Sequence, residues 1–78
     1  MIRLNETELE KNYKVVKICS DDAIKRRFLD IGIVPEARIK KVLISPFGGI
    51  SAYFIMGATI AIRDNDARRI WVVSNEEV

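Results

Sequence analysis

The chain has 78 residues, 49% of them hydrophobic, and its 13 basic and 11 acidic side chains leave a formal net charge of +2. This length predicts a single domain, residues 1–78, whose stability comes from an ordinary apolar core. The near balance of charges argues against the strongly basic surface of a dedicated nucleic-acid-binding protein.

The chain contains no histidine and a single cysteine, Cys19. These counts exclude an intrachain disulfide, a site built from histidine and cysteine ligands, and a Cys–His nucleophile pair. We therefore expect neither an enzyme activity nor a cofactor. A lone thiol is typical of a reducing compartment, and the residues before Thr7 have no apolar run like that of a signal peptide, so we expect a cytoplasmic protein.

The first dozen residues are polar and mixed, and we expect only Leu4 and Leu9 to anchor them, with Thr7 as the cap of a single helical turn. Residues 13–19 are rich in β-branched side chains and predict a strand. Asn12 tolerates a positive φ, so we expect it to form the turn that precedes this strand.

A helix is predicted to begin at Asp21 or Asp22, because an aspartate at a helix start accepts hydrogen bonds from free backbone N–H groups. Four apolar residues recur at helical spacing on one face: Ile24, Phe28, Leu29 and Ile31. Gly32 stands where a helix ends in a left-handed residue, Ile33 is placed to fold back on the helix, and Pro35 prevents its continuation.

The second half of the chain predicts short strands joined by turns. Residues 38–44 predict a strand whose imperfect alternation indicates a bulge, or burial on both faces. Residues 45–49 form a loop, and Gly57 and Ala58 are expected to form a type II′ turn between two strands of a hairpin. The hairpin strands, a helical turn and a last strand follow in this order: residues 51–56, 59–63, 64–67 and 70–73.

The predicted fold is mainly β, a small antiparallel barrel of about five strands with one α-helix covering an end. Residues 42–62 carry no charge, and by length alone this stretch also suits a bilayer span. Strands separated by turns explain it better, because one proline and three glycines interrupt it.

Asp64 and Asp66 are the weak candidates for a metal site, since their carboxylates offer oxygen ligands to a hard cation. The rest of a calcium-binding loop is missing, and a turn explains the same residues better. From the residues alone we therefore predict no metal site.

The basic residues suggest an alternative function, a small barrel that binds nucleic acid. Six of them, in two groups, would face phosphates: Lys25, Arg26, Arg27, Arg38, Lys40 and Lys41. Tyr53, Phe54 and Trp71 would then be stacking platforms. We favour core positions for these three aromatic residues, because so small a chain needs its large apolar side chains inside.

One loop is the predicted partner-binding surface. Its five residues are Pro46, Phe47, Gly48, Gly49 and Ile50. An apolar loop tip on a rigid barrel is a common protein-binding site. Phe47 either projects from the loop or packs over the end of the barrel, and the sequence leaves both alternatives open.

Four motifs in one register resemble the ferrous iron transport protein A (FeoA) family, and together they cover nearly the whole chain. The loop at 45–48 is one of them, and six residues carry the others: Phe28, Leu29, Gly32, Gly57, Arg63 and Ala67. The same domain is similar to the C-terminal SH3-like domain of iron- and manganese-dependent repressors. The chain departs from the family pattern at Asn12 and Glu36, where glycine is frequent, and at Gly49 and Ile50.

The resemblance implies an SH3-like barrel that serves as a small cytoplasmic accessory protein of bacterial ferrous iron uptake. It implies protein–protein contact with the membrane iron transporter, FeoB, and its G-protein domain through residues 46–50 and the adjoining surface. It implies neither catalysis nor direct membrane insertion, and no nucleic acid is expected. Because the family is associated with transition metals, a stand-alone regulatory or metal-binding module is a further alternative.

Overall fold

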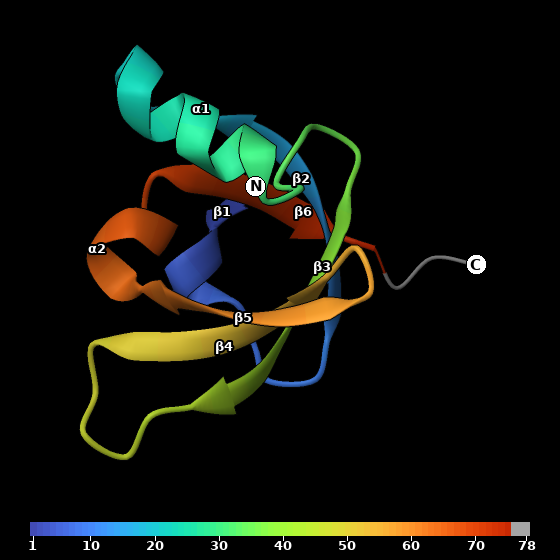
Figure 1. Cartoon of the computed structure of the whole chain (residues 1–78). Coiled ribbons are helices and arrows are strands. Elements are labelled where there is room, and N and C mark those ends of the chain that lie inside the picture. Colours follow the sequence, from blue (N-terminus) through green and yellow to red (C-terminus); the bar gives the residue numbers. More distant parts are fainter. Residues whose placement is uncertain (76–78) are drawn as a thin grey trace.

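A computed structural model describes residues 1–75 of the chain and contains six strands, two α-helices and one 3-10 helix (Figure 1). In chain order these are β1 Ile2–Arg3, η1 Leu4–Glu6, β2 Asn12–Ile18, α1 Asp22–Asp30, β3 Arg38–Ile44, β4 Ile50–Ile55, β5 Ala58–Arg63, α2 Asp64–Ala67 and β6 Ile70–Ser74. All strand pairs are antiparallel, and the order across the sheet is β1-β6-β2-β3-β4-β5. The predicted mainly β fold is confirmed, with β1 as an additional short strand.

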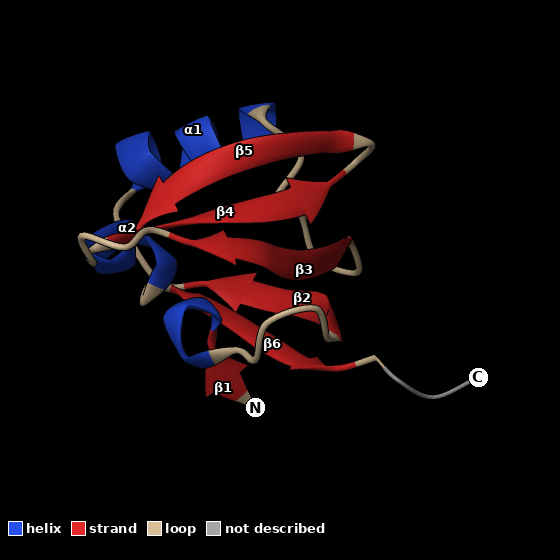
Figure 2. Ribbon diagram, turned by 90° about the horizontal axis from the view of Figure 1, so that it is seen from below, coloured by secondary structure: helices blue, strands red, loops and turns tan. Residues whose placement is uncertain are grey.

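The sheet curls around one apolar core, and α1 lies across an opening of the curled sheet (Figures 1 and 2). The core side chains are each at most 9% exposed: Leu4, Tyr13, Val15, Ile18, Phe28, Ile33, Ala37, Ile39, Tyr53, Ile55, Ile62, Ala67, Ile70 and Val72. They come from every strand except the two-residue β1, and from both α-helices and η1. No helix within residues 1–75 is long and apolar enough to cross a membrane.

The helix α1 begins and ends as its sequence predicts. The Asp21 carboxylate accepts a hydrogen bond from the N–H of Ile24 at 3.0 Å. After the last turn, Gly32 has φ +100°, and a Cβ atom there would stand 2.7 Å from Cγ of Met56. Glycine is therefore required at this position both for its backbone conformation and for the close approach of Met56.

The predicted apolar face of α1 is only partly buried. Phe28 lies in the core, and the N–H of Ile33 folds back to its carbonyl at 2.9 Å. Leu29 and Ile31, however, are exposed. The apolar face is therefore buried only in part, because α1 covers the opening with a narrow stripe of its surface.

The hairpin turn between β4 and β5 differs from the predicted one. Met56 and Gly57 occupy the turn with φ values of +52° and +80°, and Ile55 pairs with Ala58 across it. Two positive φ angles define a type I′ turn, so the expected type II′ turn at Gly57 and Ala58 was wrong by one residue. The type I′ geometry matches the right-handed twist of the two strands.

Near the N-terminus the structure confirms Leu4 as an anchor but leaves Leu9 exposed. Thr7 follows η1, and its Oγ1 donates to the carbonyl of Leu4 at 2.8 Å, so it ends the helical turn rather than beginning it. The positive φ expected at Asn12 occurs at Glu10, and Glu36 also has a positive φ of 78°. A left-handed conformation is one that glycine adopts more readily than glutamate does.

Lys41 is the one charged side chain that is buried among residues 1–75, at 6% exposed. Its Nζ donates to the carbonyls of Asn5 at 3.1 Å and Thr7 at 3.0 Å, which caps the C-terminal end of η1. Burial lowers the pKa of Lys41, and the negative charge of Asp64 partly opposes that shift. Lys41 therefore does not face phosphates as the nucleic-acid alternative required, because it lies on the inner face of β3.

Tyr53 is fully buried beside Lys41, whose Nζ lies 5.9 Å from the centroid of the tyrosine ring. The Tyr53 hydroxyl donates to the carbonyl of Leu4 at 3.4 Å. Burial, and after it the charge of Asp64, raises the pKa of Tyr53 to about 12. We use the name η1 seat for Lys41, Tyr53 and the backbone carbonyls of Leu4, Asn5 and Thr7 to which they donate.

Candidate docking surface

The loop between β3 and β4, which we call the hairpin tip (residues 45–49), presents Phe47 to solvent with 95% of its surface exposed. The N–H of Phe47 donates to Oγ of Ser45 at 3.2 Å, and the N–H of Gly48 donates to the Ser45 carbonyl at 3.0 Å. These bonds hold the tip in a defined turn. Of the two alternatives for Phe47, the structure therefore supports the projecting one.

Two further apolar side chains beside the tip are exposed, Leu43 at 63% and Ile44 at 51%. Leu43 pairs with Ala52 on β4, and Ala52 pairs with Ala61 on β5, so three strands contribute to one outer face. A shallow depression of about 120 Å³ is lined by Leu43, Ala52 and Ala61, together with Ser45, Ile50 and Ser51. We call Leu43, Ala52 and Ala61 the apolar strip. Ile44 pairs with Ser51, so it is exposed on the opposite face of β3.

Sequence reasoning missed Leu43 and Ile44 as exposed apolar side chains beside the tip. The available signal was the bulge predicted within residues 38–44, and the structure places it between Lys41 and Leu43. A bulge shifts the inside–outside alternation by one residue, so side chains beyond it cannot be assigned to a face from periodicity alone.

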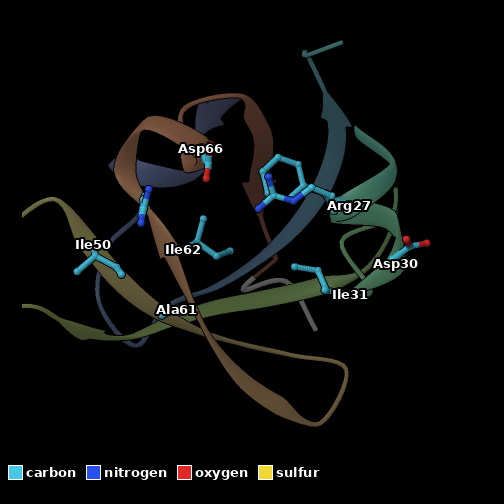
Figure 3. Close-up of a pocket in the computed structure, with 9 residues that line it drawn as sticks. Arg27, Asp30, Ile31, Ile50, Ala61, Ile62 and Asp66 are labelled. Atoms are coloured by element: carbon cyan, nitrogen blue, oxygen red, sulfur yellow. The ribbon is translucent and has the colours of Figure 1, made fainter. Parts of the chain in front are cut away.

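A second and larger cavity, of about 670 Å³, lies between α1, β5 and α2 (Figure 3). Its lining residues are Arg27, Phe28, Asp30 and Ile31 from α1, Ile50 from β4, Ala61, Ile62 and Arg63 from β5, and Asp66 from α2. The side chains of Arg27 and Ile31 extend from α1 toward Ile62 and Asp66. The predicted loop residue Ile50 lies between the two depressions and lines both.

The predicted motif residues serve mainly the fold. Phe28 and Ala67 are buried, and Gly32 and Gly57 form turns with positive φ. Arg63 differs, because it is exposed at the end of β5 and lines the larger cavity. Leu29 is also exposed, so among these six residues Leu29 and Arg63 are the ones available for contact with another molecule.

Asp64 and Asp66 lie in the first turn of α2, and both are half-buried. Residues 1–75 bring together no group of three or more histidine, cysteine, aspartate or glutamate side chains. The two aspartates therefore lack a third ligand of these types in the described part of the chain. This donor set does not fit a resident metal ion, which usually needs three or more protein ligands.

Several residues of the nucleic-acid alternative are engaged within the domain. Lys40 pairs with Glu10 at 3.8 Å, and Trp71 stacks on Arg3 with its ring centroid 5.2 Å from the guanidinium carbon. Phe54 is exposed on the outer face of β4, so the prediction that it lies in the core was wrong. The reason is that even-numbered positions of β4 face solvent.

A family model described as the FeoA domain matches residues 2–74. No curated protein is similar enough to count as a match. Among solved structures, a FeoA-like protein from Clostridium acetobutylicum is 30% identical, with a TM-score of 0.87 and coverage of 99% of this chain and 90% of that chain.

FeoA from Stenotrophomonas maltophilia, solved in complex with zinc and described as a prokaryotic SH3-domain protein, is 25% identical with a TM-score of 0.81. That match covers 94% of this chain and 91% of the other. A manganese-dependent transcriptional repressor in complex with manganese is 28% identical with a TM-score of 0.85; the match covers 94% of this chain and 36% of the repressor. The SH3-like fold and both predicted resemblances are thereby confirmed.

Proposed function

This chain belongs to the FeoA domain family, and from that premise we propose that it is a cytoplasmic accessory protein that contacts the membrane ferrous iron transporter. The family is non-enzymatic and is associated with ferrous iron transport. The partner in this proposal is the cytoplasmic part of FeoB, including its G-protein domain. Contact at that domain would affect assembly of the transporter or its nucleotide turnover.

The observation that carries the proposal is the exposure of Phe47, at 95%, on a hydrogen-bonded turn. A large apolar side chain held in water has no stabilising role in the isolated chain, whereas aromatic side chains are frequent binding hot spots. Leu43 is also exposed, on the outer face of β3 close to the tip in sequence. The apolar strip and the exposed Phe47 therefore offer apolar contacts to a partner at this end of the hairpin.

The test is an NMR titration of ¹⁵N-labelled protein with the cytoplasmic G-protein domain of the cognate transporter. We expect amide shifts confined to residues 43–50 and to the neighbouring positions of β4 and β5. Phe47→Ser is expected to weaken binding about tenfold or more, because loss of a hot-spot side chain is that large.

A matched control is Met56→Asn, which removes another large exposed apolar side chain, 72% exposed, just beyond the opposite end of β4. Asparagine before Gly57 suits the type I′ turn, so this variant is expected to fold and to bind like the unchanged protein. Absence of any shift with the G-protein domain, together with discrete shifts near Asp64 and Asp66 on adding Fe²⁺ alone under anaerobic conditions, would reject the docking function in favour of a metal-binding module.

A further inference from the structure

The strand β5 is a free edge of the sheet along its whole length. Among residues 1–75 it pairs with β4 and with no other strand (Figure 2). The opposite edge is β1, which has only two residues and therefore offers little for another chain to pair with. β5 has six residues, so it is the long unprotected edge of the sheet.

A backbone hydrogen bond at one end of the β4–β5 hairpin shows which residue pairs of the two strands are hydrogen-bonded. The N–H of Asp64 donates to the carbonyl of Gly49 at 2.9 Å. That bond flanks the pair Ile50 and Arg63, which is therefore a non-hydrogen-bonded pair. Hydrogen-bonded and non-hydrogen-bonded pairs alternate along an antiparallel ladder, so the pattern of every other pair in the hairpin follows.

By this alternation, Ile60 and Ile62 direct their backbone N–H and C=O groups at β4. The corresponding groups of Thr59 and Ala61 point away from β4, toward the open edge. The side chains of both residues are small and exposed, so they leave room for another backbone to approach. The edge thus presents two donors and two acceptors in the spacing of a strand.

The larger cavity runs along this edge. Ala61 and Ile62 both line it, although side chains of neighbouring strand residues point to opposite faces of a sheet. Both line the same cavity because the cavity lies beside the edge of the sheet and not over one of its faces. Its other wall is α1, where Phe28 and Ile31 provide apolar surface (Figure 3). A volume of about 670 Å³ lies within the range of binding pockets.

Charged side chains of the cavity favour an acidic occupant. Arg27 and Arg63 line it, and neither makes an ion pair in the part of the chain that the structure describes. Of the two lining carboxylates, Asp30 points away from the cavity and Asp66 points into it (Figure 3). Two guanidinium groups against one inward carboxylate leave a positive charge uncompensated, which a carboxylate of the occupant would neutralise.

We propose that the β5 edge binds an extended segment of a partner protein as an added β-strand, with an acidic side chain directed at Arg27 and Arg63. Thr59 and Ala61 supply the backbone hydrogen bonds, and alternate side chains of the segment contact α1. This site is distinct from Phe47 on the hairpin tip. It does not depend on the proposed contact with the iron transporter.

Two end-blocked hexapeptides of alternating valine and threonine test the proposal, one with a central glutamate and one with a lysine at the same place. Each is titrated into ¹⁵N-labelled full-length protein. With the glutamate peptide we expect the amide protons of Thr59 and Ala61 to move downfield and to gain protection from hydrogen exchange. We expect weaker binding of the lysine peptide. No response at these two amides to either peptide would overturn the proposal.

Two variants separate the backbone contribution from the charge contribution. Ala61→Pro removes one outward N–H while keeping the ladder to β4, and is expected to weaken binding of both peptides about tenfold. Arg27→Gln leaves the backbone intact and is expected to remove most of the preference for glutamate over lysine. If Arg27→Gln binds both peptides as the unchanged protein does, the assignment of an acidic segment is wrong.

Sedimentation equilibrium decides whether a second copy of the chain is the occupant instead. We expect a monomer, and a dimer that Ala61→Pro abolishes would overturn the proposal of a separate partner segment. Phe47→Ser is expected to bind the glutamate peptide normally. The outcomes for the β5 edge and for the transporter contact can therefore be told apart.

Discussion

In the half of the β3–β4 hairpin that precedes the bulge, the paired residues Lys41 and Tyr53 face the core and are almost completely buried. In the half beyond the bulge, Ile44 and Phe47 are exposed although they are the more apolar residues. If side-chain polarity alone decided burial, Lys41 would be exposed, and Ile44 and Phe47 would be buried. The difference shows that strand register and the extent of the core decide burial in this hairpin.

The two halves also differ in what their side chains do. In the η1 seat, the ammonium group of Lys41 satisfies two carbonyls that a short helix leaves without partners, so a charge is retained in the core. At the hairpin tip, Phe47 contributes nothing to the core. We therefore expect changes in the η1 seat to alter stability, and changes at the tip to alter binding.

The largest expected effect contrasts Tyr53→Ala with Phe47→Ala. Removing the fully buried Tyr53 ring leaves a cavity and should lower the free energy of unfolding by about 3 to 5 kcal/mol. Removing the Phe47 ring should change it by no more than about 0.5 kcal/mol. Urea unfolding followed by circular dichroism measures both, and similar losses for the two variants would contradict the comparison.

The next effect concerns alkaline pH. The pKa of Tyr53 is about 12 in the folded chain against an ordinary value of 10.0, so the folded state keeps a proton that the unfolded state releases. The stability that this provides is complete below pH 10 and is lost as pH rises through 12, with a total of about 2 to 3 kcal/mol.

The control for this pH effect is Tyr53→Phe, which lacks the titrating group. The lowered pKa of Lys41 acts in the opposite direction, because deprotonation relieves a buried charge as pH rises toward 10.5. That contribution is present in both proteins and cancels in their difference. Urea unfolding between pH 9 and pH 11 should show a steeper decline for the unchanged protein, and parallel curves would argue against a buried phenol at this position.

A smaller effect is expected for Lys41→Met, which keeps the length and apolar part of the side chain. The carbonyls of Asn5 and Thr7 lose their donor, and the expected cost is about 1 to 3 kcal/mol. Lys40→Met is the matched control, since Lys40 makes only a partly exposed ion pair at 3.8 Å and should cost less than about 1 kcal/mol. Thermal unfolding of the two variants at neutral pH measures the difference; equal losses would refute the capping role.

The smallest effect lies at the far end of the same hairpin. Met56 has a positive φ, which a side chain of its kind rarely adopts, whereas asparagine before glycine is favoured in a type I′ turn. Met56→Asn should therefore raise the free energy of unfolding by about 0.5 kcal/mol. Chemical denaturation measures this gain, and a loss of stability would show that contact with Gly32 outweighs the turn.

Local sequence by itself determined most of the elements. Asp21 as a helix cap, Gly32 as a left-handed stop and the helical turn at α2 were predicted and are observed. Of the two alternatives for residues 38–44, the structure shows the bulge. Each of these features depends on a few neighbouring residues, so short-range chemistry is sufficient to specify it. The loop at residues 45–49 was also predicted and is observed, whereas partner binding at residues 46–50 stays a prediction.

Only the tertiary structure decided which side chains these elements bury. Lys41 was expected at the surface and lies inside, and Phe54 was expected inside and lies at the surface. The free edge of β5 and the cavity beside it depend on strand order and on where α1 crosses the sheet. These properties arise from contacts between residues far apart in the chain, and the periodicity of a single strand carries no information about its neighbours.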